Sequence, residues 1–539
     1  MPLQDWPHPA DSRGVSILLN VGTAAACAAL MAPSAFAQGY QLEEVPARWR
    51  FSLESIDVNG VGDGSLLGVQ YELMDVFDTP GLFAGLGGYG SMTGDLGGFF
   101  AGGLNLGWRQ SLAERFAVEA GAFVGAGGGG AAAVGASGLV LRPFIALEHT
   151  SENYGLRLEL ANTSLAGADF NEVALSLGLT LPVRFLSGHQ RSSWADPISI
   201  SALDFERWEL ESAVAFLDPT SGSQRRDGTT FGDGLSLGGI KLNADLSDSS
   251  HIPIEAWGAV GGGTSGYRAL MAGYGLHGPL LSSVVPGGLQ WELELLGGLA
   301  GGGNTDTGGG LAFEANAGVR ARFAANWTAH VALSYFDAPT GDLTATGLQL
   351  GLAWDPRMLS LGSSYDRSRL ATEALPPSEG LFDVWQMGTA YKIYRPRAGK
   401  LKSDGAKYAS SLHLAGLSAE RHINEFFSVL VRAFGAVEGN VGGYSEGLAG
   451  MRLAASPFDF LGNTELYLEY DIGAAGGGAV NVGSGLIHQT TAGLAWSPWT
   501  GVEVGFGIGR MNARLSGDFS ASVIEAGVSF DVARLIARN

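Results

Sequence analysis

The chain has 539 residues, of which 84 are glycine, 46% are hydrophobic and 16% are charged. Glycine this abundant often marks disorder, but disordered chains have few aromatic residues, and these make up 10% of this chain. The formal net charge of -21 argues against nucleic acid as a partner, because phosphate binding requires clustered lysine and arginine.

Residues 1–37 are predicted to be a cleaved signal peptide. An apolar stretch at 15–32 follows Arg13, and the sequence Ala-Phe-Ala at 35–37 fits the small-x-small cleavage rule. An uncleaved membrane anchor and a lipoprotein acylated at Cys27 are the alternatives. Cys27 is the only cysteine, so the mature chain is expected to form no disulfide and to use no thiolate chemistry.

After residue 38, apolar and polar residues alternate with a period of two over segments of about ten residues. From residue 313 to 323, Phe313 and Val319 belong to an apolar set at odd positions, and Glu314 and Arg320 to a more polar set at even positions. Such alternation predicts β-strands with one apolar and one polar face. Membrane barrels have strands of this kind, which averaged hydropathy does not detect.

A long internal repeat organises these strands. Glycine bursts at 127–129, 301–303 and 476–478 lie about 175 residues apart, and similar strands recur around each of them. Counting predicts eight strands in each of the repeats 47–186, 206–356 and 381–533, or about 24 strands. The predicted domains are therefore 38–186, 187–356 and 357–539, and each joint (187–205 and 357–380) is either a linker or an extra hairpin.

Two kinds of connection join the predicted strands. Short turns such as 323–327 and 422–426 are expected on one side, and longer loops such as 220–234 and 395–407 on the other. This asymmetry is typical of outer-membrane barrels, as are girdles of aromatic residues at the strand ends. The predicted girdle residues are Trp108, Phe144, Phe323, Trp327, Trp354, Trp496 and Trp499.

Each repeat resembles an OmpA-like, porin-like outer-membrane β-barrel of eight strands. The hairpin Gly318–Trp354 carries the resemblance best, with its Asn326-Trp327 turn and its closing sequence at 351–354. The resemblance implies a location in the outer membrane of a Gram-negative bacterium, contact with lipid and lipopolysaccharide, and folding by the barrel-assembly machinery. Such barrels tend to end in an aromatic residue, whereas here Phe530 lies inward of the C-terminus.

The sequence leaves two closures open for this transmembrane antiparallel β-barrel. One barrel of about 24 strands would have a wide lumen, because diameter grows with strand number. Three tandem eight-stranded barrels would each be filled by side chains. The single barrel is favoured because the joints between repeats are short.

The favoured function is a passive porin-like channel for small solutes, with a preference for cations. Carboxylates lie on the polar face of the strand before each glycine burst, and Arg320 and Arg322 are placed to pair with Glu292 across a hairpin. An acidic pore lining favours cations, although the same residues would serve equally as ion pairs bracing a wet interior. The pore-lining candidates are Glu119, Glu292, Glu294, Arg320, Arg322, Glu465 and Glu469.

Two alternatives come from other functional classes. The first is a structural or assembly barrel of an export or surface-attachment complex. Separately, a basic patch on an outer loop is expected to contact anionic lipopolysaccharide or polysaccharide. The patch consists of Arg395, Arg397, Lys400 and Lys402. A loop that is only exposed to solvent would explain these residues equally well. The weaker alternative is an outer-membrane hydrolase, suggested by His149 beside Glu148 and by His330 near Ser334.

No enzyme activity, cofactor or metal is predicted. Three matches to the dinucleotide pattern G-x-G-x-x-G, at 85–90, 125–130 and 261–266, lack the helix that such a site requires. The nine histidines show no pair at metal-ligand spacing.

Overall fold

The computed structural model of the protein describes strands and the turns between them over residues 40–535. Gaps in this description lie at 59–61, 77–78, 95–96, 130–137, 152, 167–169, 191–195, 198–202, 206–207, 282–287, 356–358, 362–372, 375–381, 425, 456–462 and 500. Within the described residues, no helical segment is long and apolar enough to cross a bilayer. The predicted signal peptide lies outside the described part of the chain.

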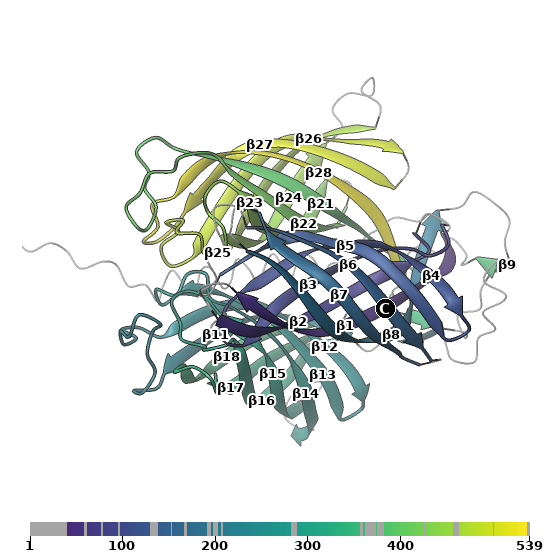
Figure 1. The fold of residues 1–539 in the computed structure, drawn as a ribbon, viewed down its shortest axis with the longest axis horizontal. Coiled ribbons are helices and arrows are strands. Elements are labelled where there is room, and N and C mark those ends of the chain that lie inside the picture. The colour runs from purple at the N-terminus through teal and green to yellow at the C-terminus, as the bar shows by residue number, and fades with distance from the viewer. Residues whose placement is uncertain are drawn as a thin grey trace, which may run out of the picture.

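Twenty-four strands form three closed antiparallel barrels of eight strands each (Figure 1). Barrel 1 consists of β1 (Tyr40–Val58), β2 (Gly62–Met74), β3 (Leu82–Thr93), β4 (Phe100–Ala113), β5 (Phe116–Gly128), β6 (Leu139–Thr150), β7 (Gly155–Leu165) and β8 (Phe170–Gln190). Barrel 2 consists of β11 (Trp208–Pro219), β12 (Leu235–Ser247), β13 (Ser250–Gly261), β14 (Arg268–Leu281), β15 (Leu289–Gly301), β16 (Leu311–Ala324), β17 (Trp327–Asp337) and β18 (Thr344–Trp354). Barrel 3 consists of β21 (Phe382–Pro396), β22 (Leu412–His422), β23 (Phe427–Glu438), β24 (Ser445–Ala455), β25 (Thr464–Gly476), β26 (Leu486–Trp499), β27 (Val502–Ala513) and β28 (Ser520–Leu535).

The prediction of 24 antiparallel strands is confirmed, and the three-barrel alternative is the closure that forms. The single wide barrel favoured from the sequence is wrong. In each repeat the first strand pairs with the last, as β1 does with β8 from Tyr40↔Gln190 to Glu54↔Ser176. This pairing leaves no open sheet edge to join the next repeat. Among the described residues, a single β-bridge, Ala533↔Gly188, joins barrels 1 and 3.

The joints between the barrels pair with each other. In the first joint, β9 (Asp196–Pro197) and β10 (Leu203–Phe205) are short strands, as are β19 (Leu359–Leu361) and β20 (Glu373–Ala374) in the second. β10 pairs antiparallel with β19, and β9 pairs parallel with β20. The joints therefore add strands, but these strands connect the two joints to each other.

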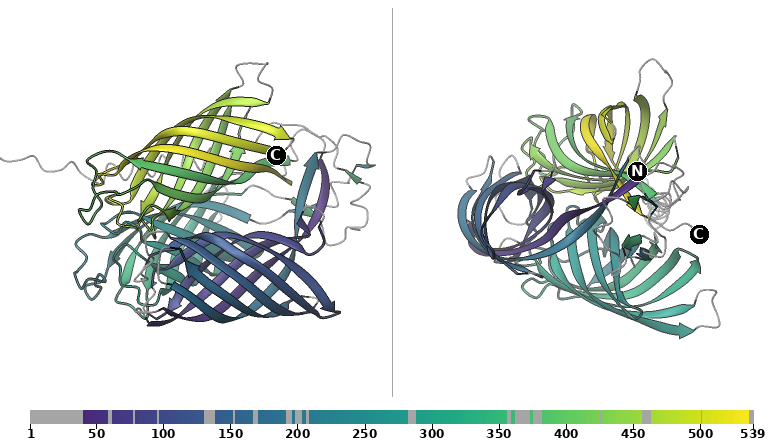
Figure 2. Two further views of the ribbon diagram at one scale, coloured as in Figure 1. Left: turned by 45° about the horizontal axis from the view of Figure 1, so that its top comes forward. Right: turned by 90° about the vertical axis from the view of Figure 1, so that its right-hand side faces the viewer.

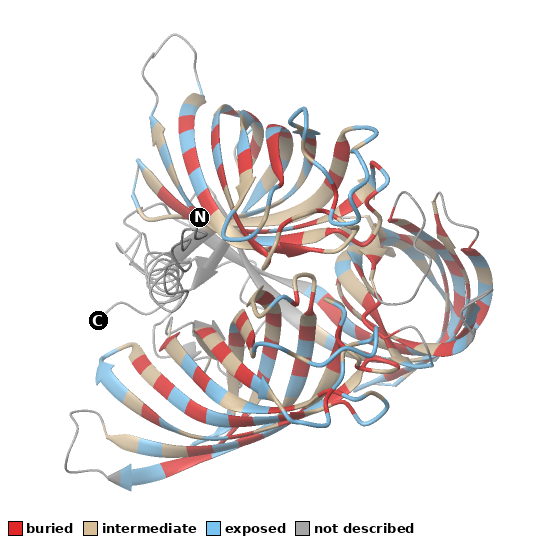
Figure 3. Ribbon diagram, turned by 90° about the vertical axis from the view of Figure 1, so that its left-hand side faces the viewer, coloured by how far each residue is buried: buried red, intermediate tan, exposed pale blue. Residues whose placement is uncertain are grey.

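The barrel walls are apolar outside and polar inside. On β16 the outward Phe313 is 49% exposed, while the inward Glu314 and Arg320 are 5% and 4% exposed. Leu295, Leu333 and other large aliphatic side chains point outward and are more than half exposed. Buried and exposed positions alternate along the strands in Figure 3. A water-soluble barrel would have the opposite arrangement.

Each lumen is filled in two layers. We call the end with the glycine bursts the loop end, and the end with the short turns the turn end. An apolar cluster closes each lumen toward the loop end, and charged side chains fill it toward the turn end. The clusters include Phe99 and Phe123 in barrel 1, Tyr267 and Phe336 in barrel 2, and Tyr444 and Phe519 in barrel 3.

The glycine bursts are the places where the barrels meet. A glycine after the third strand of each barrel lies against the burst of the next barrel: Gly98 against Gly302, Gly266 against Gly477, and Gly443 against Gly129. The third strands β3, β13 and β23 contact β15, β25 and β5 in the same cyclic order. The right-hand view of Figure 2 shows the three barrels grouped around a common centre.

These contacts require glycine for two reasons. Gly98, Gly266 and Gly443 have φ angles of +83°, +89° and +84°, which other residues rarely adopt. A Cβ atom on each would also lie within 2.4 to 2.9 Å of backbone nitrogen in the neighbouring barrel. The glycine repeat therefore encodes the close packing of one barrel on the next.

Candidate functional site in the barrel interiors

The interior of barrel 1 is crossed by arginine–glutamate pairs. Arg48 on β1 bonds to Glu72 on β2 at 2.8 Å, and also pairs with Glu119 on β5, on the opposite side of the barrel. Glu119 pairs in turn with Arg157 on β7, which bonds to Glu159 at 2.7 Å. The chain of ion pairs thus spans the lumen.

The charges inside barrel 1 balance. The ion pairs of its interior join five glutamates to five arginines, and no histidine faces inward among the described residues. The aromatic rings of Phe83, Tyr89 and Phe144 lie under these guanidinium groups at 4.8 to 5.1 Å. The glutamates are Glu54, Glu72, Glu119, Glu148 and Glu159, and the arginines are Arg48, Arg50, Arg109, Arg142 and Arg157.

Barrel 2 has a different interior. Six carboxylates face its lumen, but the only buried lysine or arginine side chains among its described residues are Lys241 and Arg320. Three histidines are also buried in this barrel: His251, His277 and His330. The six carboxylates belong to Glu209, Glu211, Glu255, Glu292, Glu294 and Glu314.

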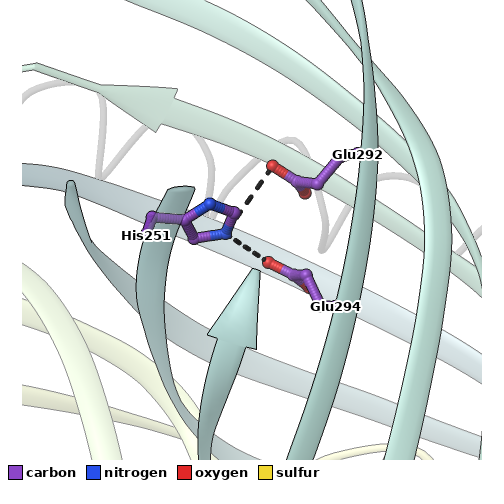
Figure 4. A group of neighbouring side chains, drawn as sticks. All are labelled: His251, Glu292 and Glu294. Atoms are coloured by element: carbon purple, nitrogen blue, oxygen red, sulfur yellow. Dashed lines mark hydrogen bonds and ion pairs between the residues drawn. The ribbon is translucent and has the colours of Figure 1, made fainter. Parts of the chain in front are cut away.

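Two histidines of barrel 2 contact carboxylates on other strands. His330 on β17 lies 3.0 Å from Glu211 on β11 through Nδ1 and 3.0 Å from Glu292 on β15 through Nε2. His251 on β13 lies 2.9 Å from Glu294 on β15 (Figure 4). Lys241 donates to Glu294 at 2.6 Å. These contacts brace the barrel across its interior.

Barrel 3 combines ion pairs with a small cavity. Arg432 pairs with Glu469, Asp471 and Glu525, and Arg452 lies 2.7 Å from Glu420. A cavity of about 50 Å³ lies beside these side chains. This space has room for water molecules.

The structure places most of the predicted pore-lining side chains inside the barrels. Glu119, Glu292, Glu294, Arg320 and Glu469 are buried in the lumens. Glu465 faces the same side of β25 as Glu469 but is only half-buried, near the turn end. Arg322 is largely exposed. Whether these residues line a conducting path stays a proposal.

The predicted pairing across the β15–β16 hairpin is present for one arginine. Arg320 lies 3.2 Å from Glu292, as predicted. Arg322 instead approaches Glu209 on β11 at 3.7 Å. Both arginines lie on the inward face of β16, but Arg322 is too close to the turn end to reach Glu292.

The predicted basic patch is only partly exposed. Arg395 and Arg397 are exposed, and Lys400 forms an ion pair with Asp518. Lys402 is 8% exposed and donates to the backbone carbonyl of Asn440. Lys402 therefore does not belong to an outer basic surface, because its loop folds back over barrel 3.

The pairs that suggested a hydrolase are not assembled. His149 points outward and packs on the ring of Phe116, whereas Glu148 points inward. Ser334 donates to Glu314 rather than to His330.

Four of the seven predicted girdle residues are exposed near the turn end. Trp108, Phe323, Trp496 and Trp499 are 45% to 70% exposed. Phe144 instead points into barrel 1. Trp327 and Trp354 pack with Val429 and other apolar residues between barrels 2 and 3. A periodic sequence does not distinguish a lipid-facing aromatic residue from one that faces another barrel.

A loop contact over barrel 2 changes the acidity of an exposed group. Thr229 donates from its hydroxyl and backbone amide to Asp227, and the Asn304 side-chain amide donates to the same carboxylate. These hydrogen bonds lower the pKa of Asp227 from 3.8 to about 2. The contact ties the loop 220–234 to the glycine burst of the same barrel.

Known proteins resemble this chain only weakly. No protein-family model matches the sequence, and no curated protein does. A designed transmembrane β-barrel matches with 14% identity over 28% of this chain and 96% of its own, with a TM-score of 0.18. Pseudomonas aeruginosa OccK2 (OpdF), solved in complex with glucuronate, matches with 9% identity over 92% of this chain and 98% of its own, with a TM-score of 0.21.

The outer membrane protein OpdK of Pseudomonas aeruginosa gives a similar result. It matches with 9% identity over 92% of this chain and 99% of its own, with a TM-score of 0.21.

Proposed function

We propose that this protein is an integral outer-membrane protein with three closed barrels, acting as a structural or assembly platform. The observation that carries the proposal is the filling of every lumen by an apolar cluster and a layer of ion pairs. A barrel filled in this way is a rigid body with a lipid-facing wall.

The exterior supports a membrane location. Leu295 and Leu333 on barrel 2 and Ile508 on barrel 3 are 68% to 71% exposed on the outer wall, which would be costly in water. Barrel strands of 11 or more residues are long enough for the hydrocarbon core, which a tilted strand spans in about 9–11 residues. Only closed barrels and helices satisfy their backbone groups there.

The partners follow from this location. Lipid covers the outward aliphatic side chains, and the barrel-assembly machinery inserts the chain after removal of residues 1–37. The exposed Arg395 and Arg397 lie near the loop end of barrel 3, where they can pair with the phosphates of lipopolysaccharide. The loop end also offers a surface for an export or surface-attachment partner.

Reconstitution into a planar bilayer tests the platform. Insertion should be accompanied by a compact, fast-migrating band in unheated gels, and by no conductance steps of the size that a wide porin produces. Large, stable steps from the folded protein would contradict the closed platform. A folded protein that fails to enter lipid would contradict the membrane location.

A porin-like passage for small solutes is the second candidate, and barrel 3 favours it. Its cavity is lined by Glu420, Glu503 and Glu525 together with Arg432 and Arg452, so water and small cations could enter it from the turn end. If this barrel conducts after rearrangement, replacement of Arg452 by alanine should raise the conductance several-fold and increase selectivity for cations. An R48A variant in barrel 1 is the matched control and should conduct like the wild type, because barrel 3 is unchanged in it.

A further inference from the structure

Three potential metal ligands meet inside barrel 2. The ligand atoms of His251, Glu292 and Glu294 all lie within 4.8 Å of one another. His251 Nε2 lies 2.9 Å from a Glu294 oxygen and 3.9 Å from a Glu292 oxygen (Figure 4). The histidine comes from β13 and both glutamates from β15, so the group joins two strands that are not neighbours in the barrel.

The surrounding groups hold these ligands as a metal site would. His251 Nδ1 lies 3.2 Å from His277 Nδ1, and such a contact to the second ring nitrogen fixes the orientation of a ligating imidazole. The side chain of His251 is fully buried. Its ring packs over Gly275, where a Cβ atom would lie 2.2 Å from the imidazole. The glycine thus makes room for the ligand.

One ligand oxygen has an ion pair but no hydrogen bond. Glu292 is 2% exposed, and its Oε2 atom has no hydrogen-bond partner. Arg320 lies 3.2 Å from this oxygen but not in the alignment of a hydrogen bond. A buried carboxylate oxygen without a hydrogen bond is costly, and a cation would satisfy it.

The charge of the lumen also suits a cation. Among the described residues, six glutamates face two buried permanent cations in barrel 2, whereas the ion pairs of barrel 1 join five glutamates to five arginines. Lys241 would compete with a metal ion for Glu294, since its ammonium group lies 2.6 Å from that carboxylate. It can remain near Glu255, 3.4 Å away, when another cation takes Glu294.

We propose that barrel 2 binds one divalent metal ion that accepts nitrogen and oxygen ligands, through His251, Glu292 and Glu294. Zinc is the appropriate probe, because its bonds of about 2.0–2.2 Å place neighbouring ligands about 3.4 Å apart in tetrahedral geometry. The observed separations of 2.9 and 3.9 Å lie on either side of that value. A water molecule would complete the shell.

The site would brace the barrel near its turn end. His251 follows directly after Ser250, where β13 leaves the short turn, so ions would enter from that end. The bound ion would tie β13 to β15 and so raise the stability of the folded barrel. The inference is independent of whether any barrel conducts.

Zinc titration of the full-length, metal-stripped protein in detergent tests the site. The wild-type chain should bind one Zn²⁺, and H251A and E294Q should each weaken binding at least about tenfold. A K241M variant should bind more tightly, because the competing ammonium group is gone. H413A is the matched control, since His413 is an outward-facing histidine of barrel 3 that bonds to Tyr391, and it should bind like the wild type.

A spectroscopic measurement on the wild type avoids any folding defect in the variants. Stoichiometric Co²⁺ should give the visible absorption bands of a low-symmetry nitrogen and oxygen site, and Zn²⁺ should abolish them. Failure of the wild type to bind either ion stoichiometrically would overturn the proposal. So would unchanged affinity in a folded H251A variant.

Discussion

Barrels 1 and 2 have the same eight-stranded wall but balance their buried charges differently. In barrel 1 each glutamate lies near arginines, whose charge does not change at any physiological pH. In barrel 2 the carboxylates outnumber the fixed cations, and histidines take part in the ion pairs. Histidine is the side chain whose charge most readily changes near neutral pH.

The difference shows that the wall and the filling of a barrel are separate problems. Any alternation of outward apolar and inward polar residues builds the wall. The filling only has to satisfy buried polar groups, and arginine–glutamate chains and histidine–carboxylate clusters both do so. The excess of carboxylates over fixed cations makes barrel 2, rather than barrel 1, the place where the proposed ion would bind.

The largest effect is expected from breaking the network of barrel 1. Replacement of Glu119 by glutamine removes the charge shared by Arg48 and Arg157, and should lower the free energy of unfolding by about 3 kcal/mol. Urea titration of the reconstituted protein measures it. E114Q, in an exposed turn, should change stability by less than about 0.5 kcal/mol. Equal losses in the two variants would contradict the network.

Replacing one histidine in barrel 2 and one in barrel 1 tests whether the buried histidine stabilises its barrel. H330L should lower the free energy of unfolding by about 2–3 kcal/mol, because it leaves Glu211 and Glu292 without a shared partner. H149L, on the outer wall of barrel 1, should be nearly neutral. The same unfolding assay measures both variants, and a neutral H330L would show that the histidine does not brace barrel 2.

The contact between barrels 1 and 2 is expected to contribute less to the free energy of unfolding than the buried ion pairs do. G98V places a branched side chain at φ +83° against Gly302, and should destabilise the contact by about 1–2 kcal/mol. Barrels 1 and 2 should then unfold in two separate thermal transitions. G102A is the control, because a Cβ atom at Gly102 meets no atom within 4 Å. A single transition in G98V would mean that other contacts couple the barrels.

The smallest effect is expected from protonation of Asp227 in the loops over barrel 2. Since the folded pKa of Asp227 is about 2 and its ordinary value is 3.8, the stabilising contact is complete above pH 3.8. It should be lost as the pH falls from 3.8 through about 2. The side-chain amide signal of Asn304 should follow this titration in an NMR spectrum. The D227N variant should show no such inflection, and an inflection near 3.8 in the wild type would contradict the loop contact.

The wall of the barrels could be predicted from the sequence, and their closure could not. The alternation at 313–323 was enough to place Phe313 outside and Arg320 inside. Pairing of β8 with β1, or with the first strand of the next repeat, satisfies that alternation equally well. The choice depends on long-range pairing, which short joints do not determine.

The site in barrel 2 was missed for a related reason. His251 is about forty residues from Glu292 and Glu294 in the sequence, and metal-ligand spacing is recognisable only within a turn or hairpin. The contacts between barrels did leave a signal. A glycine precedes a buried aromatic residue at 98–99, 266–267 and 443–444, once in each repeat.

Disulfide trapping tests most directly whether each repeat closes on itself. Leu53 on β1 and Leu177 on β8 are direct partners, and both are exposed on the outer wall. Cysteines at these two positions should cross-link rapidly in the membrane-inserted protein, because barrel 1 is closed between β1 and β8. In a single ring of 24 strands β8 would pair with the next repeat, so absence of this cross-link in a folded, inserted protein would contradict three separate barrels.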